Sequence, residues 1–193
     1  MLMWALIALS ANGCARHAPP AGSTQAASTA LTEPSTDCLP DRSGYLSVRV
    51  RGAQNLDIDW HDAELQCDGG PRPDQGGLRL TFAARAPVGG RRARLVFGIA
   101  ALPGAGISRE VPANVTLILE GENRLYSTRG DGKCTIDELV QTPIEAAAHA
   151  LRVAGRGFCA APAAAIDGRD DVLVTRFDFA GRVVDADAAG HPQ

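Results

Sequence analysis

The sequence predicts an all-β domain: an antiparallel β-sandwich or barrel-like sandwich of about nine strands, with one short helix and two disulfides. Short runs that alternate apolar and polar side chains at a period of two indicate half-buried strands. Turn-forming residues separate these runs, and 33 of the 193 residues are glycine or proline, about 17% where roughly 12% is usual. Setting aside the first 37 residues leaves 156, which is the usual size of a single domain with one core.

The first predicted hairpin joins Tyr45–Val50 to Leu56–Trp60, with a turn at 52–54. When the two runs are paired as antiparallel strands, the residue numbers of each pair of partners sum to 106. That register places position 38 opposite position 68, one residue from Cys67. We therefore expect a disulfide between Cys38 and Cys67.

A second hairpin is predicted to pair Lys133–Leu139 with 150–158, folding about residue 146, and to bring Cys134 close to Cys159. The last predicted strand is Val172–Phe179, in which Leu173, Thr175, Phe177 and Phe179 are expected on one face. The other predicted strands are Leu78–Phe82, Arg94–Ile99, Val115–Glu120 and Arg124–Thr128. Segments rich in turn-forming residues separate the strands. The predicted turns are Asp68–Pro71, 89–90, Gly121–Asn123, Arg129–Gly132 and Asp167-Gly168.

The one predicted helix lies near residues 143–149. The segment Thr142-Pro143-Ile144-Glu145 has the pattern of a capping box with proline at the first helical position. A helix of about two turns is expected to follow it.

The N-terminus is typical of an exported protein. Leu2–Leu9 is an uncharged apolar run, well short of the ~20 residues that a membrane-spanning helix needs. It is followed by Gly13-Cys14, which resembles the lipobox of bacterial lipoproteins. The resemblance implies a signal peptide at 1–13 and a lipidated, palmitate-bearing Cys14 as the mature N-terminus. The alternative is a secretory signal cleaved nearby, with Cys14 as an ordinary cysteine.

Residues 14–37 are small and polar, include three prolines and show no apolar periodicity. Such a segment cannot bury enough surface to offset its ordering entropy, so it is predicted to be a flexible tether. The folded domain is expected over 38–185, and 186–193 as a disordered tail.

The lipobox, the tether and the ending from Gly157-Phe158-Cys159 to Phe179 resemble lipid-anchored β-rich domains of unknown role in proteobacteria. The resemblance implies an outer-membrane lipoprotein, with its domain in the periplasm or at the cell surface. Ala15, directly after the cysteine, favours sorting to the outer membrane. The expected partners are the membrane, through the lipid anchor, and an envelope protein.

Charge excludes some other partners. The chain has 19 basic and 22 acidic side chains, a net charge of −3, and therefore no strong field of either sign. This argues against nucleic-acid binding and against a polybasic membrane patch.

The cysteine count favours disulfides over a metal site. With Cys14 lipidated, four of the five cysteines remain, which is an even number in an exported protein. No C-x-x-C pair provides the ligand spacing of a zinc site.

The sequence offers little for catalysis. Only His61 and His149 lie in the predicted domain, and no G-x-S-x-G motif is present. We therefore expect a non-enzymatic binding or structural module without a cofactor. A hydrolase would require His149 in a deep pocket beside a serine and a carboxylate.

One strand carries a candidate binding site. Asp57, Asp59 and His61 are expected on one face of Leu56–His61, with apolar residues on the other. Two carboxylates and an imidazole are weak candidates for a Ca²⁺ or Zn²⁺ site. The simpler interpretation is the solvated face of a half-buried strand. The alternative function is therefore a calcium- or small-ligand-binding β-domain.

Overall fold

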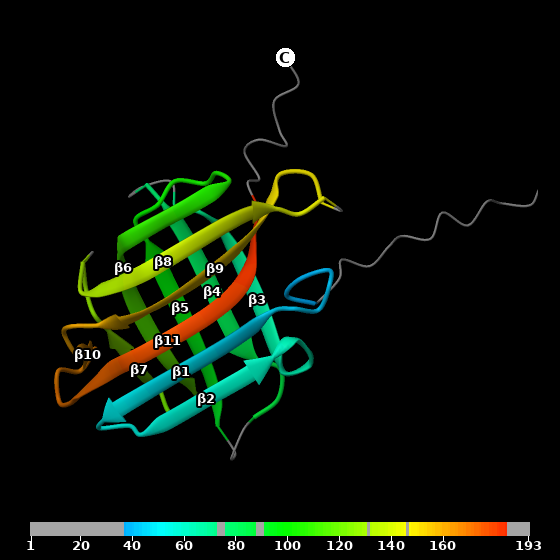
Figure 1. The fold of residues 1–193 in the computed structure, drawn as a ribbon. Coiled ribbons are helices and arrows are strands. Elements are labelled where there is room, and N and C mark those ends of the chain that lie inside the picture. The colour runs from blue at the N-terminus through cyan, green and yellow to red at the C-terminus, as the bar shows by residue number, and fades with distance from the viewer. Residues whose placement is uncertain (1–36, 73–75, 88–90, 131, 146, 185–193) are drawn as a thin grey trace, which may run out of the picture. The chain divides into compact units, whose positions relative to one another are not determined.

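The computed structural model describes residues 37–184 except 73–75, 88–90, 131 and 146 (Figure 1). These residues belong to one compact unit of the chain, Pro34–Gln193. The predicted signal peptide with Cys14, nearly all of the predicted tether and the C-terminal tail lie outside the described residues.

The all-β prediction is confirmed, with eleven antiparallel strands in place of about nine. Among the described residues the only helical element is a single 3-10 turn, Asp62–Glu64. The strands are β1 (Tyr45–Gly52), β2 (Leu56–His61), β3 (Leu65–Pro71), β4 (Leu78–Ala84), β5 (Arg92–Ile99), β6 (Gly106–Glu120), β7 (Arg124–Ser127), β8 (Cys134–Pro143), β9 (Ala150–Cys159), β10 (Ala163–Ala165) and β11 (Asp171–Val184).

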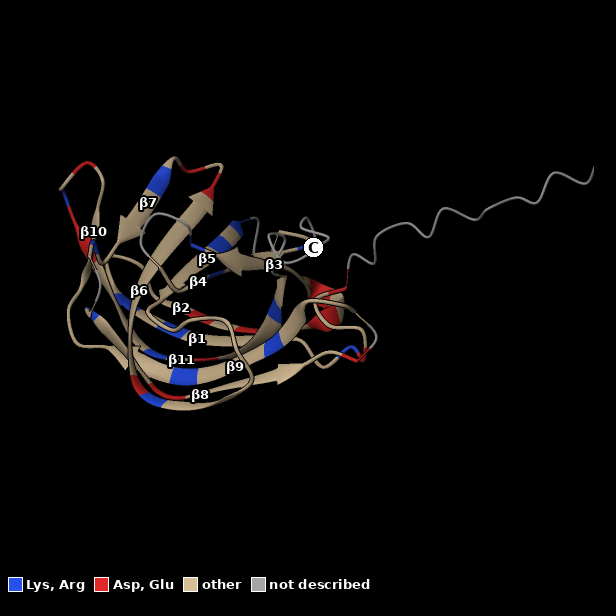
Figure 2. Ribbon diagram, turned by 90° about the horizontal axis from the view of Figure 1, so that it is seen from above, with Lys and Arg blue, Asp and Glu red and all other residues tan. Residues whose placement is uncertain are grey.

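The strands form two layers (Figures 1 and 2). The front layer has the order β2-β1-β11-β9-β8 and ends on the first half of β6, while the back layer consists of β3, β4, β5, the second half of β6 and β7. Strand β6 belongs to both layers because its first half, up to Ala113, pairs with β8, and its second half, from Ala113 on, pairs with β5. Within the first half, Glu110 has a φ of 53°, and the ladder with β8 leaves this residue unpaired without a change of register.

An aromatic cluster fills the space between the layers. Phe82 and Phe97 come from β4 and β5, and Phe177 and Phe179 come from β11, all fully buried. The ring centroids of Phe97 and Phe179 are 4.9 Å apart, and those of Phe82 and Phe179 are 5.7 Å apart. Packing of these rings across the two layers therefore stabilises the sandwich.

Both predicted hairpins and both disulfides are confirmed. Strands β1 and β2 pair with Val48 opposite Ile58, the expected register. The disulfides are Cys38–Cys67 and Cys134–Cys159. The second links residues that are direct partners in the β8–β9 ladder.

The first disulfide forms by a different route from the one expected. The β1–β2 ladder ends at Tyr45 and His61 and does not extend to Cys38. Instead Cys38 lies in the loop before β1, and Cys67 lies on β3 in the back layer.

The helix predicted near 143–149 is wrong. Thr142 and Pro143 belong to β8 and pair with Arg152 and Leu151 of β9. The described residues between β8 and β9 form tight turns, and His149, with φ of 58°, leads the chain into β9. A segment of seven residues is too short to be a stable helix by itself, so strand pairing on both sides prevails.

Two details of the strand predictions are also wrong. A register shift beside Thr175 turns Leu173 and Thr175 outward, while Phe177 and Phe179 point inward. Asp68–Pro71, predicted as a turn, lies within β3 and pairs with β4. A Cβ atom on Gly69 would collide with the Arg182 carbonyl oxygen, so this glycine lets β3 pack closely on β11.

Candidate functional site

The candidate residues of β2 lie on the outer face of the front layer. Asp57, Asp59 and His61 are exposed and alternate with the buried Ile58 and Trp60. The predicted alternation is therefore confirmed, and the three polar side chains face solvent.

Asp57 is held by two arginines of β1. Arg49, its direct partner in the ladder, places Nε 3.4 Å from the Asp57 carboxylate. The guanidinium of Arg51 donates to both carboxylate oxygens, at 2.8 and 3.1 Å. Hydrogen bonding from Arg51, reinforced by the charges of Arg51 and Arg49, lowers the pKa of Asp57. This carboxylate is therefore ionised and already partnered.

Asp59 and His61 are the two candidates that do come together. The Nε2 atom of His61 is 3.8 Å from Oδ1 of Asp59. The next carboxylate along the chain, Asp62, is 4% exposed and lies 3.6 Å from Arg42. Across the described ranges, no group of three His, Cys, Asp or Glu side chains has the arrangement of a metal site.

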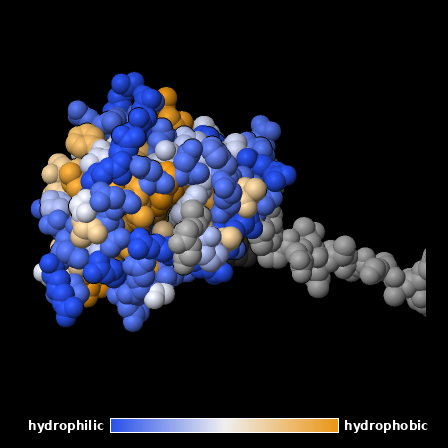
Figure 3. Space-filling view, turned by 90° about the horizontal axis from the view of Figure 1, so that it is seen from below, coloured by the Kyte–Doolittle hydropathy of each residue, from blue (hydrophilic) through white to orange (hydrophobic). Residues whose placement is uncertain are grey.

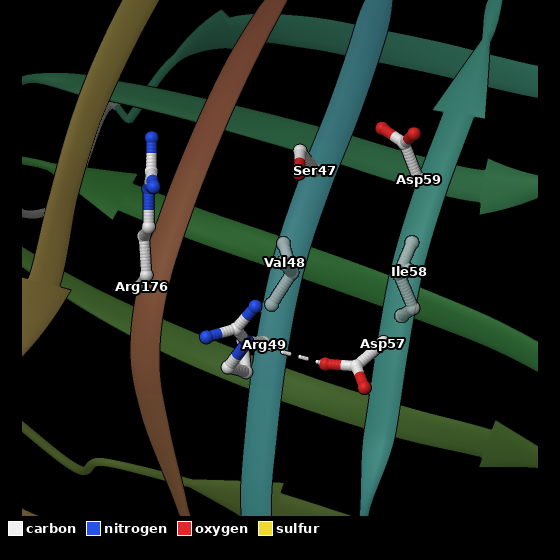
Figure 4. A pocket seen from close by; sticks show the side chains of 7 residues that line it. All are labelled: Ser47, Val48, Arg49, Asp57, Ile58, Asp59 and Arg176. Carbon is white, nitrogen blue, oxygen red and sulfur yellow. Dashed lines mark ion pairs between the residues drawn. The ribbon is translucent and has the colours of Figure 1, made fainter.

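A shallow groove runs over β11, β1 and β2 (Figure 4). Its volume is about 290 Å³, and Val48 and Ile58 lie along it. The charged and polar side chains around it are Ser47, Arg49, Asp57, Asp59 and Arg176.

Arg176 is the member of this groove that sequence reasoning missed. It is the direct partner of Arg49 in the β1–β11 ladder. No carboxylate of the described residues lies within ion-pairing distance of Arg176, whereas Arg49 is engaged by Asp57. The groove therefore carries an unpaired cation on its β11 side and carboxylates on its β2 side.

A row of alternating charges crosses the same face nearby. Glu138 of β8 lies 3.3 Å from Arg109 of β6 and 3.8 Å from Arg156 of β9. Tyr45 of β1 donates its hydroxyl to Asp178 of β11 at 2.7 Å. Burial, followed by the Asp178 hydrogen bond and charge, raises the pKa of Tyr45 to about 12. The outer face is thus polar and largely paired within itself.

A second polar cluster closes the end of the sandwich near β7. The buried Tyr126 accepts hydrogen bonds from Arg124 at 2.8 Å and from Gln54 at 3.5 Å. Arg124 also lies 3.2 Å from Asp170, whose charge is the main cause of the raised pKa of Arg124. The depression beside this cluster is small, about 150 Å³.

In the view from below, most of the visible face is hydrophilic, with apolar side chains at its centre (Figure 3).

His149 lines a wider, open depression of about 410 Å³ between the β8–β9 turn and the loop before β6. The described side chains around it are apolar except for Glu145 and His149 itself. The arrangement that a hydrolase would require, His149 beside a serine and a carboxylate, is therefore not formed by these lining residues.

No protein-family model, no curated protein and no solved structure matches this chain. Over the described part of the chain, no helix has the length and apolar character needed to cross a membrane.

Proposed function

We propose that this protein is an outer-membrane lipoprotein, anchored by a lipid on Cys14, whose disulfide-linked β-sandwich is a non-catalytic binding or structural module. The cysteine assignment carries the proposal. Four of the five cysteines form two disulfides, which leaves Cys14, directly behind Gly13 in the lipobox-like segment. Disulfides persist in oxidising compartments, which fits export.

Membrane fractionation and mass spectrometry of the mature N-terminus test the proposal. The wild-type chain should sediment with the membrane and carry acyl groups on an N-terminal Cys14. Cys14→Ser should lack them and leave the membrane fraction, because the apolar run Leu2–Leu9 is too short to hold it there. Ser23→Ala in the tether is the matched control and should behave as wild type. An unmodified N-terminus upstream or downstream of Cys14 would refute the proposal.

The outer face of the front layer is the surface we assign to partner binding. It presents the groove and the charged row over neighbouring strands, so it suits a polar envelope partner better than an apolar one.

The groove supports a second candidate function, binding of a small polar ligand. Asp57 is occupied by two arginines, which disfavours calcium there. Asp59 and the unpaired Arg176 instead suit a ligand that carries a positive and a negative group.

Melting curves test whether the groove binds a ligand, and calcium in particular. A ligand that binds only the native state raises the stability of that state, by about 2.7 kcal/mol at 100 times its Kd. A calcium site predicts a lower Tm in EDTA and recovery with Ca²⁺, both lost in Asp59→Asn. Asp167→Asn, at an exposed position in the turn between β10 and β11, is the control. Identical curves in EDTA and Ca²⁺ would refute calcium binding.

A further inference from the structure

Two arginines lie side by side on the outer face of the front layer. Arg152 of β9 is directly opposite Arg182 of β11, and Thr142 of β8 is opposite Arg152. Both arginines are half-buried, and no carboxylate of the described residues is within ion-pairing distance of either. Like charges directly opposite each other destabilise a sheet, so an external anion would make this pair favourable.

The carboxylate of Asp41 lies near Arg152 but is hydrogen-bonded within its own loop. Oδ1 of Asp41 accepts hydrogen bonds from the Ser43 hydroxyl at 2.8 Å and the Ser43 amide at 3.2 Å. These bonds are the main cause of the lowered pKa of Asp41, and the charge of Arg152 adds a minor contribution. Asp41 is therefore near the arginine pair without neutralising it.

An exposed apolar side chain lies on the same outer face as the arginines. Ile107 of β6 is 66% exposed and lies opposite Val140 of β8, whose partner on β9 is Ala154. Arg152 is two residues before Ala154 and projects from the same face. We call Arg152, Arg182, Ile107, Val140 and Ala154 the arginine–apolar patch.

The described chain begins close to this patch. The sulfur of Cys38 is 3.7 Å from the carbonyl oxygen of Ala180, and Ala180 is the β11 partner of Ala154. The strands that carry the patch lie together in the front layer, with basic segments on β9 and β11 (Figure 2). The described chain therefore begins beside β11, one of the strands that carry the patch.

We propose that the arginine–apolar patch lies against a lipid surface whose headgroups carry anionic phosphates. The arginines would bind phosphate oxygens, for which guanidinium geometry is well suited, while Ile107 enters the interface. This inference rests on the proposed lipid anchor. Twenty-two residues separate Cys14 from Asp37, and the flexible tether that their composition predicts would span roughly 25 Å on average. An anchor at Cys14 would hold the patch at a high local concentration beside the membrane.

Vesicle sedimentation with residues 15–193 tests the proposal without the lipid. All eleven strands and both disulfides lie within this segment, so it retains the complete core. It should bind vesicles of phosphatidylcholine with phosphatidylglycerol, bind pure phosphatidylcholine weakly, and lose binding as salt rises. Arg152→Gln with Arg182→Gln should reduce binding to the anionic vesicles by 10-fold or more, at about fivefold per arginine. Ile107→Ser should reduce it several-fold.

Arg129→Gln is the matched control, because Arg129 is an exposed arginine of the β7–β8 turn, away from the patch, and has no ion pair with a described carboxylate. It should bind as wild type. All variants should keep both disulfides, and the double arginine variant should melt no lower than wild type, because it removes two like charges that face each other. Equal binding to both vesicle types, or full binding by the double arginine variant, would overturn the proposal. So would a Tm increase with inorganic phosphate that depends on the arginines but has no counterpart on vesicles, because it would indicate a site for a free anion.

Failure of the lipid anchor is distinguishable from failure of this inference. Fractionation of Cys14→Ser tests the anchor, whereas residues 15–193 lack Cys14 and test only the patch.

Discussion

Removal of the Cys134–Cys159 disulfide should lower the stability of the domain without changing its topology. The bridge closes a loop of 25 residues. In the chain-entropy model, a loop of this length contributes about 3.5 kcal/mol at 25 °C. The two cysteines are 1% and 4% exposed, so replacing both by alanine also leaves a small void, which costs about 1 kcal/mol more. For a domain of this size, such a loss lowers Tm by roughly 10–15 °C.

Thermal melting of Cys134→Ala with Cys159→Ala under oxidising conditions measures this loss. The exposed Ser108→Ala on β6 is the control and should change the free energy of unfolding by less than about 0.5 kcal/mol. Peptide mapping without reduction should still link the Cys38 peptide to the Cys67 peptide in the double variant. An unchanged Tm would refute the entropy argument. Crossed linkage in the wild type would refute the strand pairing, and four free thiols in protein from the periplasm would refute the oxidising compartment.

Three further changes test the core and the outer face. Phe97→Ala should cost about 3–5 kcal/mol in a denaturant titration, because this buried ring packs on three other phenylalanines; a loss below 1 kcal/mol would contradict the aromatic core. Gly157→Ala should destabilise by about 1–3 kcal/mol, because the added Cβ would collide with the Thr135 carbonyl oxygen, and wild-type stability would show that the β8–β9 ladder can relax there. The raised pKa of Tyr45 means that the native state binds more protons than the unfolded state between pH 10 and about 12, so stability should fall as pH rises through that window. The fall in Tm should be smaller in Tyr45→Phe, and equal slopes would contradict the raised pKa of Tyr45, whose main cause is burial.

Local patterns in the sequence were sufficient to predict the β1–β2 hairpin and the β8–β9 hairpin. In both, period-two alternation fixes which side chains face inward, and a one-residue slip would expose the whole apolar set. That constraint also gave the correct register for Cys134–Cys159, whereas Cys38 and Cys67 are the expected partners although the β1–β2 ladder does not extend to Cys38.

The same local rules failed where strand pairing or a distant contact prevailed. Thr142–Glu145 has a helix-start pattern, but its first two residues extend the β8–β9 hairpin by pairing with Arg152 and Leu151. Asp68–Pro71 has turn composition, yet Gly69 is there because the Arg182 carbonyl approaches it closely from β11. Arg182 is distant in sequence, so no local pattern could reveal this second contact.

The candidate site residues also divide into features that a local pattern predicts and features that contacts between strands decide. Alternation along β2 was enough to place Asp57, Asp59 and His61 on one exposed face. The arginines that decide their chemistry come from other strands: Arg49 and Arg51 neutralise Asp57, and Arg176 lies beside Arg49 through the β1–β11 ladder. Net charge predicted no basic patch, and only the β9–β11 ladder makes neighbours of Arg152 and Arg182.

The sequence by itself determined the all-β class, the two hairpins and the Cys134–Cys159 disulfide, because these follow from side-chain periodicity and turn chemistry over short stretches. Only the tertiary structure decided the two-layer order, the division of β6 between the layers, the register shift at Thr175, the route by which Cys38 reaches Cys67, and the grouping of charges on the outer face. These depend on which strands pair over separations of more than a hundred residues, as β1 does with β11. The free energy of such pairing comes from burial shared between distant segments, and no local pattern of residues encodes it.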